Sequence, residues 1–308
     1  MSDAASTATS LEPAANAEPA GSEAPPPDLG ALRASLDRID DQLHDLLMER
    51  AEIVARGITK AKTGLALRPG REAQIIHRLL RRHQGKLPPQ TMVRLWRELL
   101  AGTTSIQGKY VIAVCDNDAR ASFTQIAREH FGALTPVHVH QRPAQALAEI
   151  SAGTASVAVL PVPSDADAPR EAWWTSLLQK DEPRIHVIAR LPFWGKRGEG
   201  APRVQALVVA ASAPDPSDRD RSLFGVECAP DVSRARLSSL LTTAGLAPIA
   251  IVLRRDPGAA TAQALIEVDG MLADNDPRLT RLDPALRRPV VVGSYAVGVD
   301  AMSAGNGT

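Results

Sequence analysis

The feature that most constrains this chain is a narrow apolar stripe near its start. Leucine and isoleucine recur there at alternating spacings of four and three residues, and the stripe consists of Leu32, Leu36, Ile39, Leu43, Leu46 and Ile53. This spacing aligns side chains on one face of a helix, so we expect a helix over residues 30–62. A helix of this length with one narrow stripe usually packs against a partner chain or a long neighbour.

Glycine and proline then divide the following segment into two shorter helices. The turn at residues 68–70 precedes a predicted helix over 71–83, and Pro88 and Pro89 precede another over 90–106. The inward residues are predicted to be Ile75, Ile76, Leu79 and Leu80 in the former, and Met92, Leu95, Trp96, Leu99 and Leu100 in the latter. Residues 29–107 are therefore predicted to be an all-α three-helix domain.

Composition narrows the class of protein. Residues 1–28 contain Ala, Ser, Pro, Glu and Gly but no Lys or Arg, which predicts a disordered tail without a targeting peptide, and residues 299–308 are predicted to be a second disordered tail. No segment reaches the roughly 18 apolar residues that cross a bilayer. The two cysteines, Cys115 and Cys228, have neither disulfide-framework nor metal-site spacing, so we expect reduced thiols, no metal and a cytoplasmic location.

After Gly108 the pattern changes to alternating strands and helices. An α/β domain is predicted over residues 108–212, a Pro- and Asp-rich linker over 213–220, and an α+β domain over 221–298. The predicted strands are 110–115, 156–161, 184–191, 205–211, 223–228, 248–254, 262–269 and 290–295. The predicted helices are 121–131, 144–151, 232–244 and 279–286. The fold class is thus multidomain.

Polar residues interrupt the apolar stripes of all three N-terminal helices. Arg50 continues the stripe of the first helix, Glu72 shares the stripe of the second, and Thr103 and Gln107 extend that of the third. Taken singly, these residues fit an internal ion pair, a helix cap and a polar helix end. Taken together, they predict a buried, positively charged pocket for a small dianion.

These residues occur within a recognisable order of motifs. Met48-Glu49-Arg50, Lys60-Ala61-Lys62, Arg71-Glu72-Ala73 and Trp96-Arg97-Glu98 lead to the segment 103–107. The order closely resembles the all-helical chorismate mutases, above all the mutase domain of bifunctional mutase and prephenate dehydratase proteins. The resemblance implies an intertwined homodimer that converts chorismate to prephenate in aromatic amino acid biosynthesis, without metal or cofactor.

The resemblance also implies a role for each matching residue. Arg33 would enter the site of the other subunit, Arg50 and Lys62 would bind the carboxylates, and Gln107 would donate to the ether oxygen. Glu72 would hold the ring hydroxyl, with Thr103 as a neighbouring hydroxyl and Arg71 as a further substrate-binding residue. The family spacing points to position 61, so Lys60 remains an alternative to Lys62. Arg68 stands where the mutases that the chain resembles carry aspartate, which bears on substrate affinity.

The remaining segments resemble the other parts of such bifunctional proteins. Residues 109–211 are similar to a shortened prephenate dehydratase domain, in which Gln205, Ala206 and Leu207 replace the catalytic Thr-Arg-Phe triplet, and residues 163–165 replace a second motif. Residues 221–296 resemble an ACT regulatory domain, with residues 233–237 and 254–256 in place of its phenylalanine-binding motifs. That segment is predicted to bind a small-molecule effector or to act as a scaffold.

Three other functions fit parts of the sequence. Residues 29–107 carry 14 Lys and Arg against 8 Asp and Glu, and a nucleic-acid-binding surface could consist of Arg78, Arg81, Arg82, Lys86, Arg94 and Arg97. The neutral charge of the whole chain and the cations on apolar stripes argue against nucleic acid as a partner. The other two are an inactive mutase-like sensor or partner protein and a bifunctional enzyme with residual dehydratase activity.

Overall fold

The computed structural model describes residues 28–58, 67–179, 182–195 and 197–299. The chain divides into two compact units, of which the first ends at Arg50 and the second begins at Ala51. The first helix, α1, spans Leu29–Ile58. Its predicted end at residue 62 and nearly all of both predicted tails lie outside the described residues.

The apolar stripe of α1 lies on the surface of the single chain. Leu36 is 60% exposed, Leu43 52% and Leu46 61%, although large aliphatic side chains normally lie inside a folded protein. Arg50 is half-buried and Arg33 is exposed. The predicted helix is confirmed, and the predicted packing of its stripe against a partner chain stays a prediction.

The two shorter helices form as predicted, as α2 (Pro69–Arg82) and α3 (Pro89–Ile106). Each begins with a proline in its first turn, where the missing N–H has no helical partner to lose. They pack together and against Phe193 through Ala73, Ile76, Val93 and Leu100. The prediction that Leu95 is inward is wrong, because it is 56% exposed on the side of α3 opposite Val93.

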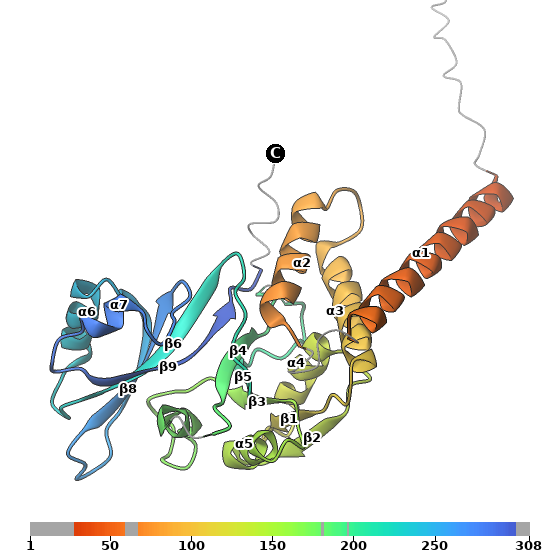
Figure 1. Ribbon diagram of the computed structural model, residues 1–308. Helices are drawn as coiled ribbons and strands as arrows, with labels where there is room; N and C mark the ends of the chain where they lie inside the picture. Colours follow the sequence, from red (N-terminus) through yellow and green to blue (C-terminus); the bar gives the residue numbers. More distant parts are fainter. Residues whose placement is uncertain (1–27, 59–66, 180–181, 196, 300–308) are drawn as a thin grey trace, which may run out of the picture. The chain divides into compact units, whose positions relative to one another are not determined.

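One nine-stranded sheet runs through the rest of the chain, in the order β2-β1-β3-β5-β4-β9-β6-β8-β7 (Figure 1). Its strands are β1 Ile112–Cys115, β2 Val137–His140, β3 Val157–Pro161, β4 His186–Leu191, β5 Ala206–Ala210, β6 Asp220–Cys228, β7 Pro248–Arg254, β8 Ala262–Asp269 and β9 Arg287–Ala296. The helices are α4 Ser122–Phe131, α5 Pro143–Ser151, α6 Arg234–Thr243 and α7 Pro277–Thr280, with a 3-10 helix at Trp173–Gln179. Strand β2 and the 3-10 helix were not predicted.

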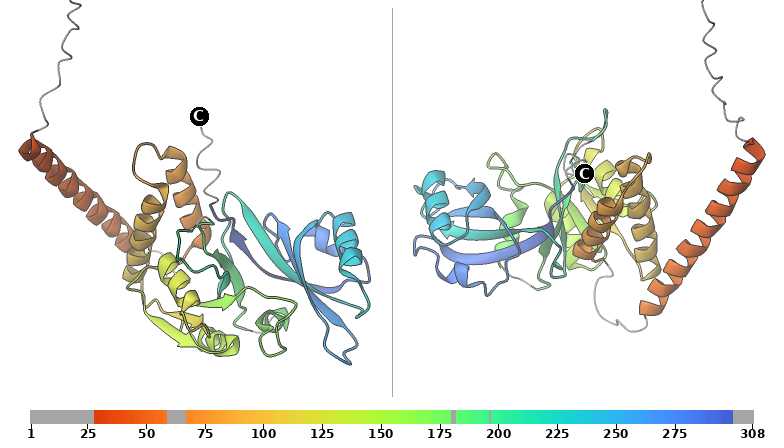
Figure 2. Two further views of the ribbon diagram at one scale, coloured as in Figure 1. Left: turned by 180° about the vertical axis from the view of Figure 1, so that it is seen from behind. Right: turned by 90° about the horizontal axis from the view of Figure 1, so that it is seen from above.

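Alternate residues of β1 belong to different cores, as the period of two in a strand requires. Ala113 and Cys115 pack with α5 and the 3-10 helix, whereas Ile112 and Val114 pack with α4. Helices α6 and α7 form a further core on β6–β9, away from α2 and α3 (Figure 2). Both cysteines are buried free thiols, as predicted.

The strands of the two predicted C-terminal domains join at β4 and β9. Val187 of β4 pairs in parallel with Gly293 of β9. Gly293 has a φ of 149°, and a Cβ atom there would lie 2.2 Å from the carbonyl oxygen of Val187, so only glycine permits this approach. The helix predicted over 279–286 is limited to the short α7, because Pro284 lacks the N–H that a longer helix needs.

The segment predicted as a linker docks on the start of α2. Asp215 accepts hydrogen bonds from the backbone N–H groups of Gly70 and Arg71, both at 3.1 Å, and from Nε of Arg68 at 3.2 Å. A carboxylate at this position satisfies amides that have no partner within the helix. Asp215 therefore caps α2 and fixes the turn that carries Glu72.

We expect Asp215→Ala to destabilise the protein by about 1–2 kcal/mol, because the first amides of α2 lose their acceptor. Asp218→Ala is the matched control, since Asp218 is half exposed and lies 3.6 Å from Arg81. That change should cost less than about 0.5 kcal/mol. Urea unfolding of both variants measures the difference, and equal stabilities would contradict the capping role.

Candidate active site on the second and third helices

The predicted site residues are distributed over three helices and one segment outside the described residues. Arg33 and Arg50 lie on α1, in the first compact unit. Lys60 and Lys62 lie outside the described residues. Arg71 and Glu72 occupy the first turn of α2, and Thr103 and Gln107 lie at the end of α3, so these four belong to the second unit.

The end of α3 carries the polar side chains that extend its apolar stripe. The hydroxyl of Thr103 is buried and donates to the carbonyl oxygens of Leu99 at 2.9 Å and Leu100 at 3.1 Å. Gln107 is the C-terminal cap of the helix, half-buried, with Nε2 at 3.5 Å from the carbonyl oxygen of Thr103. This contact is long, so the amide of Gln107 can rotate toward a ligand at little cost.

The start of α2 holds two side chains in different environments. Arg71 is exposed, and its Nη1 donates to Oε1 of Gln74 at 3.4 Å. Glu72 is only 7% exposed, and its Oε2 accepts a hydrogen bond from Nη1 of Arg97 at 2.9 Å. Glu72 is thus held as an ionised acceptor by a charge from the neighbouring helix.

Arg97 is the residue of this site that the sequence reasoning missed. It was predicted on a charged surface, but it is 4% exposed, and its guanidinium carbon lies 4.6 Å from the centre of the Phe193 ring. Burial lowers the pKa of Arg97 to about 10, which leaves it protonated at neutral pH. The available signal was its position four residues after Val93 and three before Leu100, on the buried stripe.

The surroundings of Arg97 are aromatic and largely buried. Burial raises the pKa of Tyr110 well above its usual range, and burial together with Arg97 lowers the pKa of His130 well below its own. His77 stacks on Phe193 from α2, with ring centres 5.5 Å apart. The pair of Glu72 and Arg97 therefore lies in a low-dielectric setting, where its charges interact strongly.

Neither a metal centre nor a membrane-spanning helix is found in the part of the chain that the structure describes. No group of three or more His, Cys, Asp or Glu side chains there could hold a metal ion. None of the helices there combines the length and the apolar content that a bilayer crossing requires.

Comparison with known proteins assigns the helical segment. Residues 32–108 match the family model for chorismate mutase type II. Because of this similarity, residues 32–108, a quarter of the chain, are called the mutase domain. The match begins one residue before Arg33, ends one after Gln107, and so contains every residue predicted for the mutase site.

Relatives extend the similarity beyond the mutase domain. The chain is 35% identical to a bifunctional chorismate mutase/prephenate dehydratase of Aquifex aeolicus over 112 residues, which cover 34% of this chain and 30% of that protein. It is 29% identical to one of Stutzerimonas stutzeri over 177 residues, which cover 51% and 47%. The chain thus spans less than half the length of these relatives. The longer alignment exceeds the mutase domain, so the homology continues into the following segment.

Two solved structures resemble part of the chain more distantly. A chain titled as GqqA, a novel type of quorum quenching acylase, aligns with 61% of this chain and 96% of its own, at 16% identity and a TM-score of 0.47. The prephenate dehydratase of Streptococcus mutans aligns with 61% and 98%, at 14% identity and a TM-score of 0.43.

Residues that stand in the dehydratase motifs have structural partners. The side-chain oxygen of Gln205 accepts from Nη2 of Arg190 at 2.8 Å. Asp165 accepts from the backbone N–H of Leu253 at 2.6 Å and from Arg234. These contacts join β4 to the segment before β5, and they join β7 and α6 to the segment after β3.

We expect Arg97→Met to destabilise the protein by about 3–5 kcal/mol, because it leaves the carboxylate of Glu72 buried without its cation. The double variant Glu72→Leu with Arg97→Met should regain most of this loss, since neither charge is then buried. Arg94→Met, on the exposed side of α3, is the control and should change stability by less than about 0.5 kcal/mol. Chemical unfolding measures all three, and an additive double variant would contradict the pairing.

Proposed function

We propose that this protein is a chorismate mutase, which rearranges chorismate to prephenate in aromatic amino acid biosynthesis. The observation that carries the proposal is the family match over residues 32–108, which contains all the predicted site residues in family order. The bifunctional relatives, whose names include the same activity, support it.

The rearrangement is concerted, with one ether bond breaking as one carbon-carbon bond forms. Because no proton or electron is transferred, the protein contributes by selecting the compact conformer of the substrate and by stabilising charge on the ether oxygen. Cationic and amide side chains suffice for both tasks. This chemistry accounts for a site that consists of arginine, lysine and glutamine rather than of a nucleophile and a base.

Each side chain then has a task. Arg50, Lys62 and Arg33 of the partner subunit bind the two carboxylates, and Arg71 adds a cation beside Glu72. The amide of Gln107 and the ammonium of Lys62 donate to the ether oxygen. The long contact between Gln107 and Thr103 suits this role, because the amide gives up little to reach the substrate.

Glu72 accepts a hydrogen bond from the ring hydroxyl of the substrate. Its ion pair with Arg97 keeps the carboxylate charged in a buried setting, where a lone Glu would take up a proton. Arg97 is therefore a positioning residue, and Thr103 supplies a hydroxyl to the same end of the site.

We also propose that the active form is an intertwined homodimer. The exposed stripe of α1 supports this, because an aliphatic face that runs over 22 residues, from Leu32 to Ile53, is stable in water only when another surface covers it. The C-terminal strands and helices are proposed to act as an ACT-like module that binds a small effector or forms a scaffold. Two buried free thiols fit a cytoplasmic location.

The second candidate function is a mutase-like binding protein without turnover. The observation that favours it is Arg68, whose Nε binds Asp215 beside the site and adds a cation where relatives carry aspartate. A residual dehydratase activity is a third, disfavoured by the structural contact of Gln205 with Arg190. Product analysis separates all three functions.

We expect the purified chain to convert chorismate to prephenate without forming phenylpyruvate, and Gln107→Ala to lower kcat about 100- to 1000-fold, because one donor to the ether oxygen is lost. Gln84→Ala, in the loop between α2 and α3, is the matched control and should keep full activity. Absorbance of chorismate with chromatography of products measures both. Turnover no faster than the uncatalysed reaction would reject the proposal in favour of the binding protein.

If Arg33 completes the partner's site, chains with Arg33→Ala and chains with Gln107→Ala are each inactive alone but complement each other. Mixing them under dissociating conditions should restore about a quarter of wild-type activity, because half of the dimers are hybrids with one intact site. No recovery, with hybrid dimers present by native mass spectrometry, would place Arg33 outside the shared site. Measuring chorismate turnover of Lys60→Ala and Lys62→Ala identifies the catalytic lysine, because only the variant that lacks it should lose activity.

A further inference from the structure

Both partners of the buried pair between Glu72 and Arg97 are held by residues outside the matched segment 32–108. On one side Asp215 caps the start of α2. On the other side the ring of Phe193 lies 4.6 Å from the guanidinium carbon of Arg97. Whatever holds these two residues therefore also sets where the ion pair lies.

Asp215 takes the place of a cap that α2 does not supply itself. The cap position of the helix is Arg68, whose side chain makes no hydrogen bond to the amides of the first turn. The carboxylate of Asp215 accepts from the N–H groups of Gly70 and Arg71 instead. A Cβ atom on Gly70 would lie 2.4 Å from the carbonyl oxygen of Asp215, so glycine is needed for this close approach.

The chain that follows β9 is bonded to the segment that carries this cap. We call residues 297–299 the clasp. The N–H of Val297 donates to the carbonyl oxygen of Arg219 at 2.8 Å. The turn before Arg219 is closed by Asp220, whose carboxylate accepts from the N–H of Ser217 at 2.9 Å and from its hydroxyl at 2.6 Å. A displacement of the clasp is therefore transmitted to the cap.

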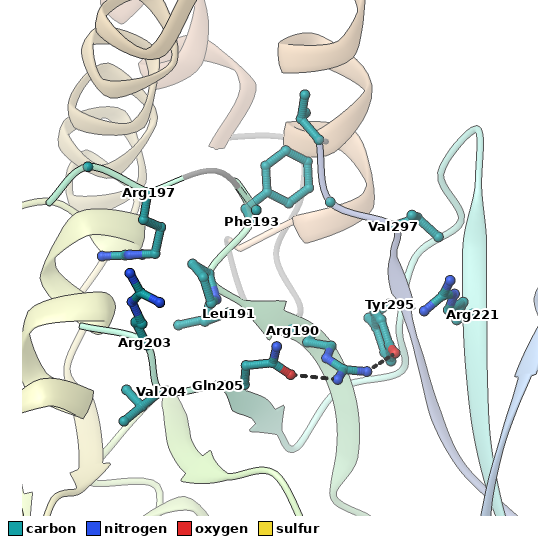
Figure 3. A pocket seen from close by; sticks show the side chains of 15 residues that line it. Arg190, Leu191, Phe193, Arg197, Arg203, Val204, Gln205, Arg221, Tyr295 and Val297 are labelled. Carbon is teal, nitrogen blue, oxygen red and sulfur yellow. Dashed lines mark hydrogen bonds between the residues drawn. The ribbon is translucent and has the colours of Figure 1, made fainter. Parts of the chain in front are cut away.

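The clasp is also bonded to the segment that carries Phe193. The N–H of Val299 donates to the carbonyl oxygen of Phe193 at 2.8 Å, and its own carbonyl oxygen accepts from the N–H of Gly195 at 3.1 Å. A Cβ atom on Gly298 would lie 2.4 Å from the carbonyl oxygen of Phe193, so only glycine permits this contact. Figure 3 shows the ring of Phe193 beside the chain that continues from Val297, in the wall of a cavity of about 510 Å³.

We propose that Asp215 and the clasp position the acid of the mutase site. Asp215 acts on Glu72 through the first turn of α2. The clasp acts on Arg97 through the ring of Phe193, and it also holds the segment that carries the cap. This inference rests on the proposed function, in which Glu72 binds the substrate. A misplacement of about 1 Å in such a group is enough to lower a rate on the order of 100-fold.

The cap is tested by a double-mutant cycle on the full chain. Asp215→Ala should lower kcat/KM for chorismate at least about tenfold, because the first turn of α2 loses its acceptor and Glu72 is misplaced. Arg68→Ser puts a hydroxyl acceptor at the cap position, so in that background the loss should shrink to within about twofold. Arg68→Ala brings no acceptor and is the matched control background, in which the loss should persist.

The clasp is tested by adding one methyl group. Gly298→Ala should lower kcat/KM at least about tenfold, because the new Cβ atom displaces the backbone of Phe193 and with it the support of Arg97. Gly198→Ala is the matched control, since a Cβ atom there meets no described residue within 4 Å, and it should keep the wild-type activity. Thermal unfolding of each variant confirms that it is folded at the assay temperature.

Hydrogen exchange gives a readout that needs no turnover. The N–H of Glu72 donates to the carbonyl oxygen of Arg68 at 2.9 Å, so it reports on the first turn of α2 through a bond within the helix. Exchange at Glu72, followed by NMR, should be at least about tenfold faster in Asp215→Ala and in Gly298→Ala. It should be unchanged in Gly198→Ala.

The outcomes separate this proposal from the mutase proposal. If folded Asp215→Ala keeps the wild-type kcat, KM and exchange at Glu72, or if its loss persists with Arg68→Ser, the positioning by the cap is overturned. If Gly298→Ala behaves as Gly198→Ala does, the role of the clasp is overturned. If the wild type shows no turnover while exchange at Glu72 responds as expected, the mutase proposal fails and the positioning of Glu72 is supported.

Discussion

The buried ion pair between Glu72 and Arg97 is the interaction on which the organisation of the second unit depends. It joins α2 to α3 at 2.9 Å, and Phe193 from the segment after β4 lies against its cation. Removing either charge leaves the other in a setting from which water is excluded, so the two helices and the segment under them are fixed together. Asp215, in the segment before β6, also holds α2 in place, because its carboxylate caps the start of that helix. Helices α2 and α3 are thereby positioned by residues that lie far along the chain.

Cationic side chains form two separate groups in this molecule. In the mutase domain, cations on apolar stripes suit a reaction in which charge redistributes within one bound dianion. In the cavity beside β4 and β9, arginines are held by Glu267 and Tyr295 from strands of the C-terminal segment.

The apolar stripe of α1 is helical, as predicted, but its side chains are not buried within the single chain. Its stripe is helical and continuous, yet Leu36, Leu43 and Leu46 are more than half exposed in the single chain. The free energy gained by covering such a face is proportional to the apolar area removed from water, so covering the stripe would stabilise the proposed dimer. The proposed dimer would bring the same stripe against its copy and Arg33 into the second site.

The sequence by itself determined the local elements and the order of the motifs. The three helices and most strands followed from periodicity and proline positions, because these depend on neighbours within a few residues. The order of motifs indicated the resemblance to the chorismate mutases, and the family match covers the same residues. Only the tertiary structure decided that Arg97 is buried, that Leu95 is exposed, that Asp215 caps α2 and that β4 pairs with β9 at Gly293. The arginines of the cavity likewise come from β4, β6 and the segment before β5. Such contacts join residues separated by up to about 145 positions, and no local pattern encodes which distant partner a side chain will meet.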